Sequence, residues 1–144
     1  MHACSDNLVT AQCSSSILDV ARMMRDSHVG AVVVMNNESP HRPVGIVTDR
    51  DIVIRVVAFA DQKTAVSIDQ VMSTNLVYVP VSTGIQDAIN LMSEHGVRRL
   101  LVRGPNQELR GIVSLDDLLP LVSGEISALA QTVAKGLLRE EARK

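Results

Sequence analysis

The chain has 144 residues, a net charge of −2 and a pI near 6.0, with 46% hydrophobic and 21% charged residues. This balance excludes the basic surface of nucleic-acid binding proteins, and one tyrosine and one phenylalanine exclude an aromatic platform for single strands. No apolar run is long enough to cross a membrane, and the first residues lack the pattern of a signal peptide. Two cysteines are too few for a secreted disulfide framework, so we expect a cytoplasmic protein. His2, Cys4 and Cys13 lack the paired spacing of a metal site, so no metal is predicted.

The first 60 residues predict a short α+β unit. Residues 7–11, NLVTA, predict a strand, and a capping box from Ser16 to Asp19 opens a helix with apolar residues at helical spacing. AVVVM at 31–35 predicts a strand buried on both faces, and VGIV at 44–47 predicts its hairpin partner. DRDIVIRVVA, residues 49–58, predicts the closing helix.

A second unit follows in the same order. Residues 5–24 align with 73–92, and GIVTDRDI at 45–52 returns as GIVSLDDL at 111–118. A capping box from Thr83 to Gln86 is predicted to open the second unit's first helix. Pro120 predicts that its closing helix is short or kinked.

These elements predict an α+β fold of two β-α-β-β-α units related by a pseudo-twofold axis. The units occupy residues 1–60 and 71–122, with a polar linker at 61–70. Because a unit of some 60 residues is marginally stable alone, the two sheets are predicted to pack against each other. Residues 123–144 predict an amphipathic helix that docks on its own pair or, slightly favoured, on a second chain; its apolar stripe is Ile126, Leu129, Val133 and Leu137.

A hydroxyl side chain and an aspartate recur three residues apart between a strand and a helix. Thr48 precedes Asp51 in the first unit, and Ser114 precedes Asp117 in the second. The pattern predicts a capping box that needs no ligand. It also fits a nucleotide site, because a hydroxyl can donate to phosphate and a carboxylate accepts from two ribose hydroxyls. Both interpretations stay open at this point.

Phosphate binding requires cations, and arginine pairs with phosphate through two hydrogen bonds. Arg98 and Arg99 precede the middle strand of the second unit, where the first unit has Gly30 and Ala31. We favour ligand contact over a purely solvated role for this arginine pair. Arg50 is a further candidate, Arg55 fits a helix surface, and His28 could reach a phosphate from the loop before Val29.

The span 2–122 resembles a tandem pair of cystathionine-β-synthase (CBS) domains. The resemblance rests on the repeated octapeptide together with VMSTNLVYV at 71–79 and HGVRRLLV at 95–102. It implies two clefts between the units, dimers of pairs, and a bound adenosine compound such as AMP, ADP, ATP or S-adenosylmethionine. The first cleft would be the fuller match, since SLDD departs further from the family pattern than TDRD.

The resemblance also implies roles for particular residues. Asp51 and Asp117 would hold ribose hydroxyls, with Thr48 and Ser114 beside the first phosphate. The arginine pair would contact phosphate. The base would lie against the first strand of a unit and against the residues before its middle strand, namely Thr10, Ala11, Val29, Gly30 and Ala31, or Tyr78, Val79, Val97, Arg98 and Arg99.

The favoured function is a non-catalytic sensor that binds an adenosine nucleotide and signals to an unknown effector protein. The alternative is a dimerisation or protein-interaction module with empty clefts, supported by the apolar tail and by the capping interpretation. An enzyme is not predicted, because the sequence has neither a plausible nucleophile set nor a phosphate-binding Gly-rich loop. Nucleic-acid and membrane partners are not expected.

Overall fold

The computed structural model describes residues 8–38, 42–59 and 66–141. The first half has three strands and two helices in the predicted order, followed by a 3-10 turn at Val57–Phe59. Its middle strand pairs parallel with the first strand and antiparallel with the third. The elements are β1 (Thr10–Gln12), α1 (Ile17–Ser27), β2 (Ala31–Met35), β3 (Pro43–Thr48) and α2 (Asp49–Arg55).

The second half repeats this arrangement after a one-turn helix, α3 (Ile68–Val71). Its sheet has the same strand order, and a register shift follows Val102 as one follows Val34 in the first half. The predicted duplication of a β-α-β-β-α unit is therefore confirmed in topology and in register. The elements are β4 (Tyr78–Pro80), α4 (Ile85–His95), β5 (Arg99–Arg103), β6 (Leu109–Ser114) and α5 (Leu115–Glu141).

The middle strands are buried on both faces, as their continuous apolar sequence predicts. Val32 and Val34 belong to the first half's own core, and Leu100 belongs to that of the second half. The alternate residues Val33 and Leu101 point the other way, into a central cluster that both halves build. The two halves, each with its own small core, therefore pack together through a third core that both contribute to. Burial of apolar side chains in this central core stabilises two units that are each too small to be more than marginally stable alone.

The segment between the halves is more structured than a polar linker. Ile68 and Val71 are fully buried in the first core, so the linker predicted at 61–70 overlaps a packed helix. Ser73 then exchanges two backbone hydrogen bonds of 2.9 Å with Ile46. These contacts hold the start of the second half against β3.

The helix starts differ between the halves. Ser16 caps α1 and accepts from the backbone N–H of Asp19 at 3.1 Å, as predicted. The box predicted from Thr83 to Gln86 is wrong, because α4 begins one residue later with Gly84 as its N-cap. Glycine has no side chain to complete the box.

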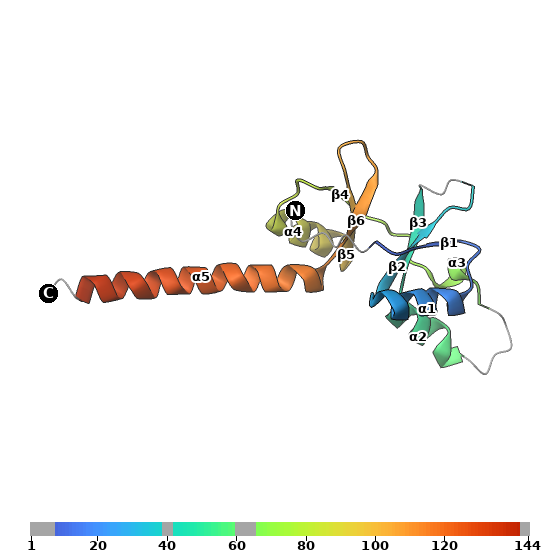
Figure 1. The fold of residues 1–144 in the computed structure, drawn as a ribbon, viewed down its shortest axis with the longest axis horizontal. Coiled ribbons are helices and arrows are strands. Elements are labelled where there is room, and N and C mark those ends of the chain that lie inside the picture. The colour runs from blue at the N-terminus through green and yellow to red at the C-terminus, as the bar shows by residue number, and fades with distance from the viewer. Residues whose placement is uncertain (1–7, 39–41, 60–65, 142–144) are drawn as a thin grey trace.

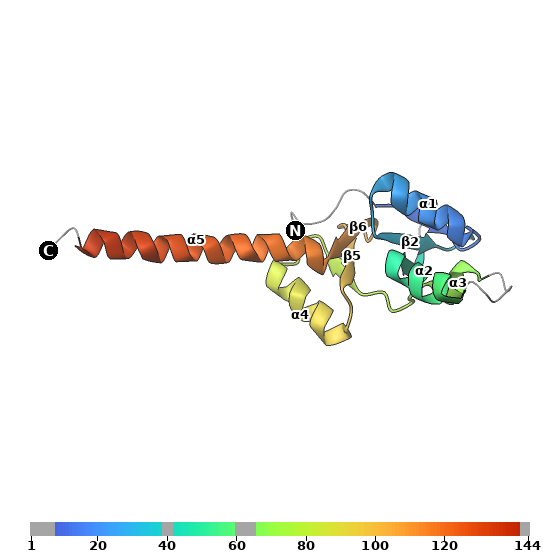
Figure 2. The ribbon, with the colours of Figure 1, turned by 90° about the horizontal axis from the view of Figure 1, so that it is seen from below.

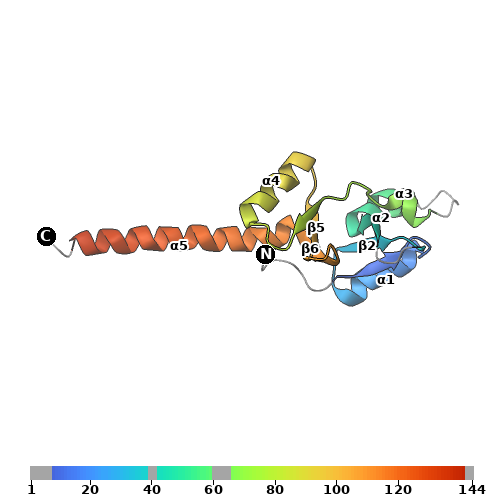
Figure 3. The ribbon, with the colours of Figure 1, turned by 90° about the horizontal axis from the view of Figure 1, so that it is seen from above.

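The prediction that the closing helix of the second half is short or kinked is also wrong. Helix α5 runs without a break from Leu115 to Glu141, through Pro120 and through the boundary predicted at 122/123. Proline removes the hydrogen bond to the carbonyl of Asp116, and that residue is exposed, so water can solvate the carbonyl. In Figure 1, and again from below in Figure 2 and from above in Figure 3, α5 projects from the two-half body as a single rod. In the described parts of the chain, no helix is both long and apolar enough to cross a membrane.

Candidate functional site

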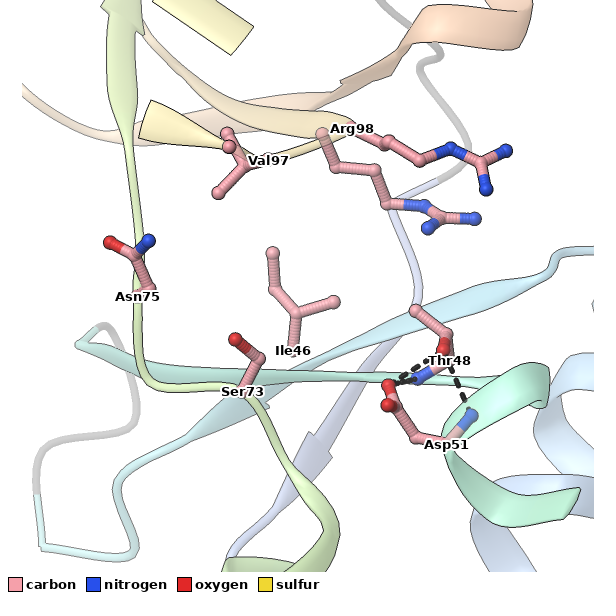
Figure 4. A pocket seen from close by; sticks show the side chains of 9 residues that line it. Ile46, Thr48, Asp51, Ser73, Asn75, Val97 and Arg98 are labelled. Carbon is pink, nitrogen blue, oxygen red and sulfur yellow. Dashed lines mark hydrogen bonds between the residues drawn. The ribbon is translucent and has the colours of Figure 1, made fainter. Parts of the chain in front are cut away.

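The first hydroxyl-x-x-aspartate motif lies where β3 turns into α2. Thr48 is the N-cap with an extended backbone, and its Oγ1 accepts from the N–H of Asp51 at 3.1 Å. Oδ2 of Asp51 in turn accepts from the Thr48 N–H at 3.0 Å and from its hydroxyl at 2.6 Å (Figure 4). The capping interpretation is therefore confirmed at this motif.

The second motif repeats the geometry where β6 turns into α5. Ser114 accepts from the N–H of Asp117 at 3.2 Å, and Oδ2 of Asp117 accepts from the Ser114 N–H and hydroxyl at 2.8 and 2.6 Å. The bonds of the first motif are partly buried and those of the second are exposed. The two motifs are thus alike in bonding and unlike in exposure.

Capping leaves room for a ligand at both motifs. The two bonds that each aspartate accepts converge on one oxygen, Oδ2, of Asp51 or Asp117. A carboxylate has two oxygens and about four acceptor positions. Each aspartate can therefore close its helix and still accept hydroxyl groups through Oδ1.

The first motif opens into a cleft of about 170 Å³ between the two halves. Figure 4 shows Thr48 and Asp51 on one side, Val97 and Arg98 on the other, and Ile46 between them. Arg98 and Arg99 therefore reach this cleft from the second half, opposite the motif of the first half. This is expected, because the first half has Gly30 and Ala31 in place of the two arginines. The lining residues are Ile46, Thr48, Asp51, Ser73, Asn75, Gly96, Val97, Arg98 and Arg99.

The second motif opens into a larger cleft of about 370 Å³. Here the motif belongs to the second half, and the residues before the middle strand belong to the first half. Each cleft thus combines the motif of one half with the residues before the middle strand of the opposite half, which we call the strand entrance: residues 29–31 in the first half and 97–99 in the second. The lining residues are His28, Val29, Gly30, Ala31, Asp49, Arg99, Ile112, Ser114, Asp116 and Asp117.

The clefts differ in charge. The first has two arginines and one aspartate among its lining residues, whereas the second has three aspartates, one arginine and a histidine. Arg99 lines both clefts. Arg98 forms an ion pair with Asp116 next to the second motif, with 3.6 Å between Nη2 of Arg98 and Oδ2 of Asp116. The first cleft is therefore the one suited to an anionic ligand.

A family model for the CBS domain matches this chain twice, at residues 2–58 and 68–124. The chain belongs to the CBS domain family. The CBS domain-containing protein YhcV of Bacillus subtilis is 38% identical, and the match covers 77% of this chain and 76% of that protein. A protein of Methanopyrus kandleri is 29% identical over 90% of this chain. This chain spans 65% of the length of the Methanopyrus kandleri protein and 35% of that of a related Thermofilum pendens protein.

Solved structures share the arrangement of two CBS units. A CBS domain protein from Pyrobaculum aerophilum, solved in complex with AMP, is 26% identical with a TM-score of 0.69. That match covers 81% of this chain and 86% of that one. The CBS domain pair of protein MJ0100 has a TM-score of 0.72 at 20% identity and covers 86% of this chain and 94% of that one, which shows the common fold.

Not every predicted site residue reaches a CBS cleft. Thr10, Arg50 and Tyr78 are absent from the lining of both clefts. Thr10 and Arg50 are exposed on β1 and α2. Tyr78 lies instead in a separate cavity of about 510 Å³, where the guanidinium of Arg103 stacks 3.6 Å from the centre of its ring.

Sequence reasoning also missed lining residues. Ser73 and Asn75 line the first CBS cleft from the segment that joins the units, and Asp49 and Asp116 line the second. Asp49 is the first residue of α2 and Asp116 is the second residue of α5, so their position in the first turn after Thr48 and Ser114 was the available signal. Asn75 also recurs at Asn7 in the repeat, but Asn7 lies outside the described residues.

Proposed function

We propose that this CBS pair is a non-catalytic regulatory module that binds an adenosine nucleotide of the AMP, ADP or ATP class in its first cleft. The observation that carries the proposal is the placement of Thr48 and Asp51 across the cleft from Arg98 and Arg99. The AMP complex of the Pyrobaculum aerophilum relative supports the same ligand class.

Each lining group has a chemical task in this proposal. Asp51 accepts the ribose hydroxyls through Oδ1, and Thr48 lies beside the first phosphate. Arg98 and Arg99 pair with phosphate oxygens, as guanidinium groups do in two-point contacts. Ile46 is buried and gives the base an apolar surface.

The second cleft suits a different adenosine compound. Asp117 can hold a ribose there, beside the apolar strand entrance at Val29, but Asp49 and Asp116 add negative charge. Carboxylates repel phosphate and attract cations. S-adenosylmethionine, whose sulfonium is positive, therefore fits this cleft better than a nucleotide with phosphates.

The module would act as a cytoplasmic homodimer that reports the bound ligand to an effector protein. Apolar side chains on the exposed surface of the first half supply a contact surface for the effector, namely Val53, Ile54, Val57 and Phe59. A ligand held between the halves can change their packing only through its differential affinity for two arrangements. The bound state would then be read at this surface.

A ligand-free dimerisation or protein-interaction module is the second candidate. It is favoured by one observation: the hydroxyl and the aspartate of each motif bond to each other as a complete capping box. On that account the aspartates serve only to close α2 and α5. It predicts that nucleotides have no effect on the protein.

Thermal unfolding with AMP, ATP and S-adenosylmethionine separates the two candidates. A ligand at 100 times its Kd stabilises the folded state by about 2.7 kcal/mol, which is a readily measured rise in Tm. Mass spectrometry of small molecules that co-purify with the protein identifies the ligand directly. No Tm shift at millimolar concentrations, together with no co-purified nucleotide, would refute nucleotide binding. Turnover assays should show no consumption of the nucleotide.

A further inference from the structure

The outer part of α5 is a long exposed helix beyond the CBS match, which ends at residue 124. Every residue from 123 to 135 is exposed. Among them Ile126, Leu129 and Val133 are 62%, 68% and 64% exposed. Most of the stability of a helix in a protein comes from packing of its apolar face, and this helix exposes its aliphatic side chains from Ile126 to Val133. It therefore requires a partner.

The spacing of these side chains specifies the kind of partner. Leu119, Val122, Ile126, Leu129 and Val133 alternate steps of three and four residues. This is the narrow seam of a coiled coil, in which one further helix covers the stripe. The hydroxyls of Ser127 and Thr132 donate to carbonyls of their own helix at 2.9 Å, so neither brings an unpaired hydroxyl to a helical neighbour.

We infer that the partner is α5 of a second copy, packed antiparallel. In that register Leu129 lies against Val133 of the second copy, and each Ile126 lies against Gly136, which leaves room for it. Leu119 and Val122, nearer the CBS body, lie outside this paired part of the seam. Glu125 then flanks Arg139 of the second copy, and the pair occurs twice by symmetry. Charges at the positions beside the seam are what sets helix orientation in coiled coils.

A parallel arrangement fits the sequence less well. Glu125 would flank Ala130, so no opposite charges would meet. The two copies of Gly136 would face each other in one layer and leave a void, which costs stability. Charge and volume thus both select the antiparallel pair, with the two CBS bodies at opposite ends of the coil.

Cysteine cross-linking in the full chain tests both partner and direction. Two chains are made in a background with Cys4→Ser and Cys13→Ala, one with L129C and one with V133C. Mild oxidation of an equal mixture should give a disulfide-linked mixed dimer, and each chain alone should give only background. Cross-linking of L129C alone, as fast as in the mixture, would overturn the antiparallel arrangement. No cross-linking in any sample would show that something other than a second α5 covers the stripe.

A matched pair of substitutions shows whether the seam causes the contact. I126D, made in both cysteine chains, places a charge in the seam and should reduce the mixed dimer to background. Q131D places the same charge on the opposite side of the helix and should leave the yield unchanged. Circular dichroism confirms that both variants keep the folded body. Equal yields for I126D and Q131D would overturn the inference, whatever the nucleotide experiments show.

Discussion

Asp51 has two separable tasks, and two substitutions distinguish them. Oδ2 closes the start of α2 through its bonds with Thr48, and Oδ1 is the proposed ribose acceptor. Asparagine keeps one acceptor oxygen for the cap and replaces the other with an N–H donor. Alanine removes both groups. Asp51→Asn should therefore impair binding alone, and Asp51→Ala should impair binding and stability together.

The expected magnitudes follow from the bonds involved. Loss of a capping side chain costs about 1 kcal/mol, so the free energy of unfolding should fall by that amount in Asp51→Ala and by a few tenths in Asp51→Asn. A hydrogen bond to a charged group contributes about 1.5 to 3 kcal/mol. The loss of ribose contacts should therefore weaken AMP binding about 10- to 100-fold in both variants.

Titration calorimetry with AMP measures the affinity, and urea unfolding without ligand measures the stability. Asp117→Asn is the matched control, because it changes the same kind of capping box in the second cleft and leaves the lining of the first cleft intact. If Asp51→Asn binds AMP as tightly as the unmodified protein, Asp51 does not hold the ribose. If Asp51→Asn and Asp51→Ala lower the free energy of unfolding by the same amount, the side-chain oxygen that asparagine keeps does not cap α2.

Further outcomes follow from other positions. Arg99→Gln should weaken AMP about tenfold and leave adenosine unchanged by calorimetry, because it removes a phosphate contact only. Gly96→Ala should lower the free energy of unfolding by about 1 kcal/mol, because Gly96 has φ +62°, whereas Gly124→Ala in exposed α5 should raise helix stability by up to about 1 kcal/mol; urea unfolding and circular dichroism measure these changes. The hydrogen bond from Ser16 lowers the pKa of Asp19, so its stabilisation is present above the ordinary carboxyl pKa and is lost as pH falls through the folded value. Ser16→Ala should therefore destabilise more at neutral pH than in strong acid, where only the loss of the N-cap bond from the Asp19 N–H remains.

The repeated unit was predictable because its signals are local. Apolar periods, turn residues and the Ser16 cap each act within a few residues, and the repeat gave every element a second, independent instance. The length of α5 was not predictable from Pro120. A proline costs one hydrogen bond and a steric adjustment, and the structure decides whether the freed carbonyl reaches water.

The clefts were predictable only in part, since they form where sequence-distant surfaces meet. The two motifs and the arginine pair could be predicted from the repeat. Gly30 and Ala31 carry no positive charge, so the arginines that face the first motif must come from the opposite half. Tyr78 is different: it stacks on Arg103, which lies two residues beyond its pairing partner Leu101 on β5, and it contacts the central cluster, which depends on how the two halves pack. No local pattern encodes that packing.

The duplication itself explains why two similar motifs lie in dissimilar clefts. Each cleft takes its motif from one half and its strand entrance from the other, so any divergence between the halves is exchanged across the axis. Arg98 and Arg99 before the second middle strand favour anions at the first motif. Gly30 and Ala31 before the first middle strand supply no positive charge beside Asp49 and Asp116 at the second motif. Arg99 lies on the lining of both clefts, and among the described residues it is the one arginine on the lining of the second. Under the proposed function, a phosphate that drew Arg99 into the first cleft would remove it from the second. Under the proposed function, the two clefts would therefore be coupled in their preference for ligand charge through one side chain, and such a coupling would be reciprocal.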